Sequence, residues 1–84
     1  MKFTVTWTEE ARNEFCELFL AASDRGKLSR IVNSIEEDLA GRPTTLGEAR
    51  GGQVRVVMES HYGMLFEVRP ADCLVKVFHI GWLP

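Results

Sequence analysis

Alternating apolar and polar residues dominate the second half of the chain. Residues 53–59 and 64–69 each alternate with a period of two, and residues 73–80 form a third run rich in β-branched and aromatic side chains. A period of two is typical of β-strands that bury one face. The gaps at 60–63 and 70–72 have the length and composition of hairpin loops. The pattern therefore predicts a three-stranded antiparallel meander.

The same alternation predicts which side chains this meander buries. The expected core face of the first two strands carries Val54, Val56, Met58, Met64, Phe66 and Val68. In that register Arg55 lies opposite Glu67 on the other face, where an ion pair contributes about 0.2–1 kcal/mol. For the third strand, a three-residue loop would bury Lys76, whereas a loop one residue longer or shorter would bury Val75 and Val77. We expect the second, because a one-residue slip exchanges the two faces of a strand.

The opposite face of the predicted sheet mixes apolar and charged side chains. Its expected members are Arg55, Val57, Leu65, Glu67, Leu74, Lys76, Phe78 and Ile80. A surface of this kind usually contacts another molecule, either a partner chain, which includes a second copy of this one, or a substrate. The residues that we predict to bind the partner are Val57, Leu65, Leu74, Phe78, Arg50 and Trp82.

One strand and two amphipathic helices are expected before the meander. Residues 2–7 alternate like a strand, and Thr8 is the predicted N-cap of a helix over residues 9–22, because a threonine oxygen accepts from the free N–H groups of a first turn. Residues 25–40 carry a second apolar stripe, which ends at a glycine followed closely by a proline. Residues 43–52 are expected to form a loop.

The order of these elements predicts an α+β fold. A β-α-α-β-β-β chain would pack its helix hairpin on one face of a mainly antiparallel four-stranded sheet. The 84 residues are enough for one domain, residues 1–84, with a modest core. The side chains expected to be buried include Phe15, Phe19, Ile31, Ile35, Phe66 and Val77.

Composition and charge exclude several classes of protein. The hydrophobic fraction of 45% is that of a folded domain, and no apolar run approaches the length of a membrane span. The N-terminus lacks the apolar core of a signal peptide, so a cytoplasmic protein is expected. A formal net charge of −2 argues against strong non-specific nucleic-acid binding. Cys16 and Cys73 are expected to be small core residues, and we predict no metal site and no cofactor.

The succession of elements and short motifs resembles a known family. A strand ending in Trp7 and a helix hairpin are followed by Gly-Glu-Ala-Arg-Gly-Gly at 47–52, Val-Arg-Val at 54–56, Tyr-Gly-Met-Leu-Phe-Glu-Val at 62–68 and Val-Lys-Val at 75–77. This pattern resembles the RelE/ParE toxins of bacterial type II toxin–antitoxin modules. The resemblance implies a toxin that is held inactive by a cognate antitoxin. RelE-like members cleave mRNA on the ribosome, whereas ParE-like members inhibit DNA gyrase.

Cleavage of RNA requires side chains that transfer protons and stabilise a phosphorane. The candidates for these catalytic roles are Arg55, His61 and Tyr62. His79 falls on the apolar face of the predicted register and is expected to be a structural residue. The resemblance implies basic residues on the sheet and at the C-terminal end, but residues 81–84 contain none.

Two classes of function follow from these candidates. The first is a toxin enzyme, a ribosome-dependent mRNA endoribonuclease. The second is a non-enzymatic binder, either a ParE-like topoisomerase inhibitor or an orphan family member that has kept only its antitoxin partner. The sparse basic residues and the negative net charge favour the second class.

Overall fold

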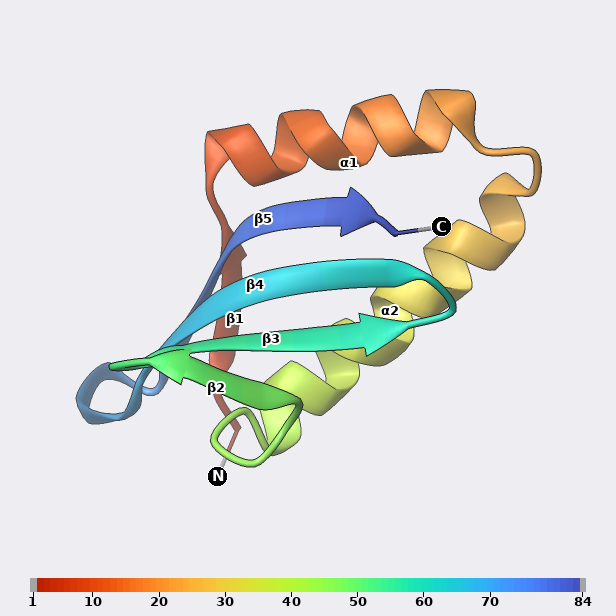
Figure 1. Ribbon diagram of the computed structural model, residues 1–84. Coiled ribbons are helices and arrows are strands. Elements are labelled where there is room, and N and C mark those ends of the chain that lie inside the picture. Colours follow the sequence, from red (N-terminus) through yellow and green to blue (C-terminus); the bar gives the residue numbers. More distant parts are fainter. Residues whose placement is uncertain (1, 84) are drawn as a thin grey trace.

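Two α-helices and five strands make up the fold of residues 2–83, the part of the chain that the computed structural model describes (Figure 1). In chain order the elements are β1 (Thr4–Trp7), α1 (Glu9–Ala21), α2 (Arg25–Gly41), β2 (Glu48–Gly51), β3 (Val54–Glu59), β4 (Tyr62–Arg69), the 3-10 turn η1 (Pro70–Asp72) and β5 (Leu74–Trp82). The sheet order is β1-β5-β4-β3-β2, with β1 parallel to β5 and the other pairs antiparallel. The predicted α+β class is confirmed, although the sheet has one strand more than expected.

Side-chain caps fix the starts of both helices. The Thr8 hydroxyl accepts a hydrogen bond from the Ala11 backbone N–H at 3.1 Å, as predicted for the N-cap of α1. Asp24 does the same for α2 by accepting from the Lys27 N–H at 2.9 Å. From the short connection between them the helices diverge, so that α1 lies along β5 while α2 crosses behind β1 and β3 (Figure 1).

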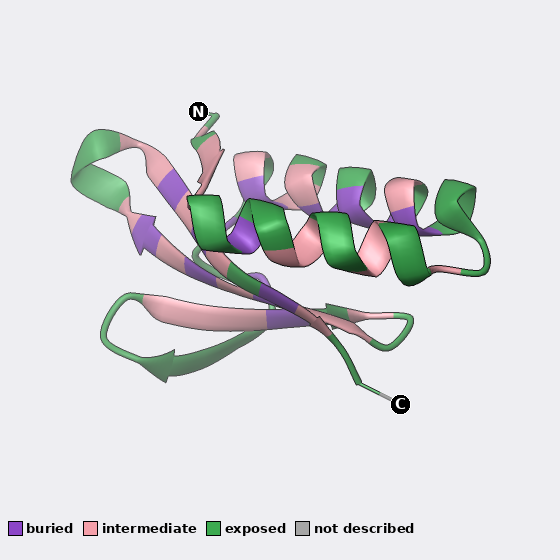
Figure 2. Ribbon diagram, turned by 90° about the horizontal axis from the view of Figure 1, so that it is seen from above, coloured by how far each residue is buried: buried purple, intermediate pink, exposed green. Residues whose placement is uncertain are grey.

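One hydrophobic core joins α2 to the covered face of the sheet. Figure 2 shows buried residues of α2 and of the strands meeting between the two layers. The buried apolar residues are Ala11, Leu28, Ile31, Val32, Ile35, Leu39, Leu46, Val57, Met64, Phe66, Val68, Val75, Val77 and Ile80. Phe15 and Phe19 were expected to be buried as well, but they are half-buried and pack at the margin of this core.

Cys16 is not the core residue that the sequence suggested. It is exposed, and Cys73 is half-buried. Cys16 directly follows Phe15 on α1, one position away from the stripe that packs inward, so the helix turns its side chain to solvent. Phe15 itself lies in an aromatic cluster, with ring centroids 5.8 Å from Trp7 and 6.1 Å from Phe19.

A tight turn between β3 and β4 sets a register different from the predicted one. Ser60 and His61 have positive φ values of 50° and 73°, and Glu59 pairs with Tyr62 across them. Two residues with positive φ are the signature of a two-residue hairpin turn whose twist suits the strands. The sequence suggested a four-residue gap, because Ser60-His61 is not one of the glycine-containing pairs, such as Asn-Gly, that usually mark a two-residue turn.

The shorter turn moves every side chain of β3 to the opposite face. Val57 pairs with Met64 on the covered face and is buried, whereas Val56 pairs with Leu65 on the other face. The predicted placement of Val54, Val56 and Met58 in the core is therefore wrong. The error arises because Val54, Val56 and Met58 form the more apolar alternation, whereas the alternation on the covered face places Val57 between Arg55 and Glu59.

An irregularity in β5 changes its faces partway along the strand. Val75 and Val77 are buried, as predicted. Phe78 has no pairing partner on β4, as in a β-bulge, so the residues after it exchange faces. Ile80 is consequently buried at 2% exposure, whereas it was expected on the opposite face, and His79 is exposed rather than structural.

The expected loop over residues 43–52 contains the edge strand β2, which pairs with β3. Gly47 precedes β2 with φ +70°, and a Cβ atom at this position would overlap the carbonyl oxygen of Val56. Only glycine fits there, since both the positive φ and the close approach exclude a side chain. Gly47 thus brings the loop close enough to β3 for β2 to pair.

Candidate functional site

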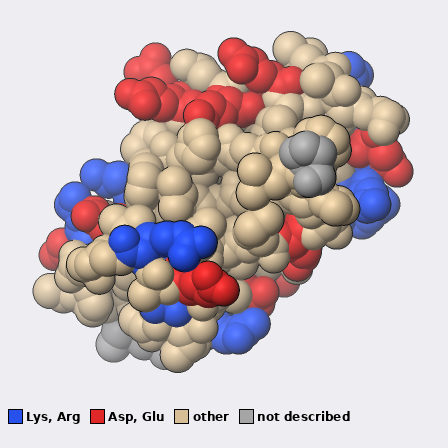
Figure 3. Space-filling model, in the orientation of Figure 1, with Lys and Arg blue, Asp and Glu red and all other residues tan. Residues whose placement is uncertain are grey.

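The face of the sheet that α1 and α2 leave uncovered, termed the open face, is largely apolar. Its apolar side chains on β3 and β4, and after β5, are Val54, Val56, Met58, Leu65 and Leu83. Met58 and Leu83 are 53% and 52% exposed, unusually high values for large apolar residues. Figure 3 shows uncharged surface at the centre of this face, with blue and red groups below it and to its left. An uncovered apolar surface of this kind is typical of a binding site.

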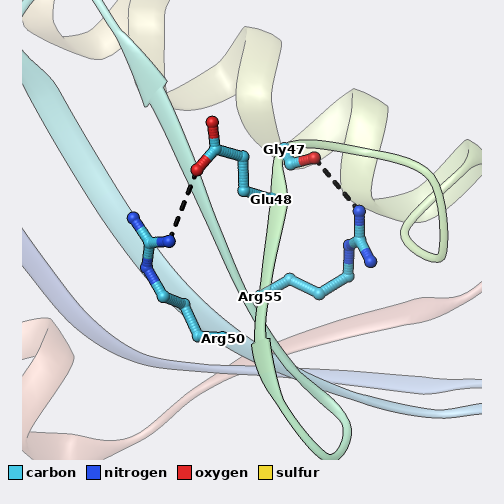
Figure 4. Close-up of polar contacts among 4 residues, drawn as sticks. All are labelled: Gly47, Glu48, Arg50 and Arg55. Atoms are coloured by element: carbon cyan, nitrogen blue, oxygen red, sulfur yellow. Dashed lines mark hydrogen bonds and ion pairs between the residues drawn. The ribbon is translucent and has the colours of Figure 1, made fainter.

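The open face also carries charged side chains, of which Lys76 on β5 forms no ion pair within residues 2–83, whereas the others form pairs. Arg50 on β2 contacts Glu48, with 3.3 Å between its Nη1 and the carboxylate oxygen (Figure 4). Arg69 on β4 contacts Glu67 at 2.8 Å. The predicted pairing of Arg55 with Glu67 is therefore wrong, because Glu67 pairs within its own strand. Both pairs are substantially exposed, and each contributes less than about 1 kcal/mol.

Arg55 lies on the other side of β3, away from the open face. It pairs with Phe66, and its guanidinium donates a hydrogen bond to the Leu46 carbonyl oxygen at 2.9 Å. A second bond, to the Gly47 carbonyl oxygen at 3.0 Å, is drawn in Figure 4. These bonds satisfy carbonyl groups of the loop that precedes β2. The local structure thus uses Arg55 to hold this loop against β3.

His61 and Tyr62 occupy the turn at the far end of β3. The Nδ1 atom of His61 lies 3.1 Å from the Leu83 carbonyl oxygen, which ties the turn to the end of the chain. Tyr62 is half-buried, packs against the core and faces Trp82 on β5. Tyr62 and Trp82 together line a cavity of about 370 Å³ at the end of α1.

The structure does not bring the three predicted catalytic residues to one point. His61 and Tyr62 are neighbours at the turn. The β3 residue that pairs with Tyr62 is Glu59, and Arg55 lies four residues before Glu59 on the same strand. At about 3.3 Å per residue, that separation is roughly 13 Å along the strand. A phosphate contacted by His61 would be out of reach of the Arg55 guanidinium, which is in any case bonded to backbone carbonyls.

The predicted partner-binding residues divide between the two faces. Leu65 and Leu74 are half-buried on the open face, as predicted. Phe78 is half-buried at the β5 irregularity. Val57 is 9% exposed on the covered face, so its predicted place on the partner surface is wrong. Trp82 is 53% exposed beside the open end of the core.

Glu14 on α1 is a residue whose role the sequence did not indicate. One carboxylate oxygen accepts a hydrogen bond from the Ile80 backbone N–H at 3.1 Å, and the other lies 2.8 Å from Nδ1 of His79. Glu14 thereby caps the part of β5 that extends beyond its pairing with β1. Because 66 residues separate Glu14 from Ile80, no local pattern signals this contact.

Residues 2–83 hold no group of three or more His, Cys, Asp or Glu side chains placed to bind a metal ion. In the same part of the chain, no helix is long and apolar enough to cross a membrane. The described residues offer an open face with apolar side chains, ion pairs, Lys76 and His79, and a second histidine, His61, at the hairpin turn.

Comparison with known proteins gives matches among solved structures. No protein-family model and no curated protein matches the chain. The toxin–antitoxin complex RelBE2 from Mycobacterium tuberculosis aligns with a TM-score of 0.81 and 18% identity, covering 98% of this chain and 92% of that one. The isolated E. coli RelE toxin aligns with a TM-score of 0.71 and 20% identity, covering 100% of this chain and 86% of that one. The chromosomal ParDE system of P. aeruginosa aligns with a TM-score of 0.70 and 15% identity, covering 99% of this chain and 98% of that one.

These similarities show that the chain has the fold of the RelE/ParE toxins. The resemblance inferred from the sequence is confirmed at the level of the fold, over almost the whole chain. The low identity means that the side chains on which function depends must be judged from this chain itself.

Proposed function

We propose that this protein is the toxin of a type II toxin–antitoxin module and is neutralised by a cognate antitoxin. The observation that carries the proposal is the similarity in structure to the RelBE2 toxin–antitoxin complex, with a TM-score of 0.81 over 98% of this chain. A complex of E. coli RelE with an antitoxin peptide has the same fold, with a TM-score of 0.73. The apolar open face supports the proposal, because such a face needs a partner to cover it.

We propose further that the toxin cleaves mRNA weakly or not at all. General acid and base groups contribute roughly 10²–10⁴ each in rate, and only when they converge on one phosphate. Here Arg55 is about 13 Å along β3 from the turn that carries His61. Its guanidinium hydrogen-bonds to the carbonyls of Leu46 and Gly47. The ribosome and its mRNA are therefore the less favoured target.

The second candidate is a ParE-like toxin that inhibits DNA gyrase by binding it. The observation in its favour is the composition of the open face, where Arg50 and Arg69 pair with carboxylates and Lys76 is the one Lys or Arg of that face without an ion pair among the described residues. A third form of the proposal is an inactive family member that retains only antitoxin binding or forms a homodimer. All of these activities belong in the cytoplasm, where we expect the protein to act.

Induction of the chain in a bacterial host tests these proposals. We expect growth arrest that is relieved when the product of the adjacent reading frame is expressed with it. Primer extension on a translated message should show no codon-positioned cuts, and purified protein should reduce supercoiling by DNA gyrase. Absence of arrest together with absence of binding to the adjacent product would overturn the toxin proposal.

The nuclease alternative has its own control. A triple variant with Arg55, His61 and Tyr62 changed to Ala is compared with a triple Ala variant of three exposed α2 residues, Arg30, Asn33 and Ser34. Strong cuts that the first variant loses and the second keeps would make Arg55, His61 and Tyr62 the active site and would reverse our proposal on catalysis.

A further inference from the structure

The carboxylates of α1 form a row along one side of the helix. Glu10, Glu14 and Glu17 are spaced i, i+4 and i+7, which places them on one stripe. With Glu9, the helix has four carboxylates and a single cation, Arg12. Figure 3 shows the resulting acidic band over α1, next to the uncharged middle of the open face.

Contacts of Glu14 fix where this row lies. Its carboxylate accepts from the Ile80 N–H and contacts His79, so the stripe runs beside the edge of β5. Glu10 and Glu17 are exposed and form no ion pair within residues 2–83. Two carboxylates are thus left available to an external cation beside the open face.

The adjoining part of the open face is sparsely filled, and it is apolar except for His79, which pairs with Leu65 and contacts Glu14. Gly63 on β4 pairs with Gly81 on β5, so two neighbouring backbone positions carry no side chain. Met58 and Leu83 lie on either side, with side-chain atoms 3.7 and 3.9 Å from the place that a Cβ of Gly63 would occupy. Both are more than half exposed, and methionine adapts its shape readily to a partner.

We infer that the open face binds a cationic amphipathic segment of the antitoxin. Its apolar side chains would cover Met58, Leu65 and Leu83, and its Lys or Arg side chains would pair with Glu10 and Glu17. The inference rests on the proposed function, since it names the chemistry of the partner of the same toxin.

Charge complementarity decides between this occupant and others. A segment with acidic side chains along α1 would meet the unpaired carboxylates of Glu10 and Glu17 and be repelled. Charges at the border of an interface mainly accelerate association and exclude wrong partners, whereas the apolar centre provides most of the affinity. A second copy of the chain would likewise bring its own acidic α1 toward the open face unless it bound in an orientation that avoids it. The partner that fits is therefore basic on one side.

The test measures binding of the purified product of the adjacent reading frame to the intact chain. The double charge reversal Glu10→Lys/Glu17→Lys should weaken binding by about tenfold or more and reduce its dependence on salt. The matched control Glu37→Lys/Asp72→Lys makes the same change in net charge at exposed positions on α2 and η1, and it should stay within about threefold of the parent. Circular dichroism verifies that both variants keep the parent fold.

Each outcome has a distinct meaning. Weakening by the α1 reversal alone supports the inference. If both double variants weaken binding equally, the effect is one of net charge, and the proposed site is wrong. If neither does, the partner does not use the acidic row, and the inference fails while the toxin proposal stands. If the adjacent product does not bind the parent chain at all, the proposed function fails and the inference fails with it.

Discussion

The two faces of the same sheet differ in what their side chains do. On β4, Met64 and Leu65 are adjacent, yet Met64 is fully buried beneath the helices and Leu65 is half-buried on the open face. On β3 the more apolar alternation, Val54, Val56 and Met58, lies on the open face, whereas the covered face carries Val57 between Arg55 and Glu59. Hydrophobicity alone therefore does not decide which face becomes the core. The decision is made by the helices that pack on one face only.

This difference separates stability from binding within a single strand. Side chains on the covered face lose contact with water on folding and stabilise the domain. Side chains on the open face gain little from folding and are available to a partner. We expect substitutions on the covered face to lower the free energy of unfolding, and substitutions on the open face to alter partner binding.

The largest expected effect on stability is that of Phe66→Ala. Phe66 is fully buried at the centre of the covered face, and loss of a buried phenyl group costs about 3–5 kcal/mol. A domain of this size has little more stability than that to lose. Chemical denaturation measures the change, with Leu65→Ala on the open face as the control. Equal, small effects of the two variants would contradict the assignment of the faces.

A smaller effect is expected at the entrance to β2. Gly47→Ala forces a side chain into a positive φ and against the Val56 carbonyl, so we expect a loss of roughly 1–3 kcal/mol. Gly41→Ala is the control, because no atom lies within 4 Å of the added methyl and its position ends α2. Should Gly47→Ala melt at the same temperature as Gly41→Ala, the close packing of this loop on β3 would be wrong.

The smallest effect concerns the start of α1. Thr8→Ala removes the hydroxyl that accepts from the Ala11 N–H and should cost about 0.5–2 kcal/mol. Thr8→Ser keeps the hydroxyl and should retain most of the parent stability. The comparison of thermal melts isolates the hydrogen bond from other consequences of truncation, and a Ser variant as unstable as the Ala variant would count against the cap.

Much of the fold was predictable because its signals are local. Thr8 caps α1 as expected, and both helices begin where their caps and stripes indicate. The register of β3 was not predictable, because it depends on Ser60 and His61 adopting positive φ. The strand β2 was missed because its exposed sequence Glu-Ala-Arg-Gly has no apolar alternation, and its pairing depends on the approach that Gly47 allows.

Candidate site residues were harder to place for the same reason. Arg55 was expected to pair with Glu67, but its partners are backbone carbonyls, which no sequence pattern marks. The faces of His79 and Ile80 depend on the irregularity at Phe78 and were exchanged in the prediction. Glu14 accepts a hydrogen bond from the Ile80 N–H, and because 66 residues separate the two, no local pattern indicates this role. Leu65 was placed correctly because its alternation with Met64 and Phe66 is unambiguous.

The most direct test of the account compares Met64→Asp with Leu65→Asp. Adjacent residues receive the same charge on opposite faces of β4, and each variant is assayed for helical circular dichroism and for binding of the adjacent reading-frame product. We predict that Met64→Asp unfolds the domain, because it buries an unpaired carboxylate, whereas Leu65→Asp keeps its helix content and loses the partner. A folded Leu65→Asp that binds as tightly as the parent, or one that unfolds like Met64→Asp, would contradict the division between a covered face that holds the fold and an open face that binds.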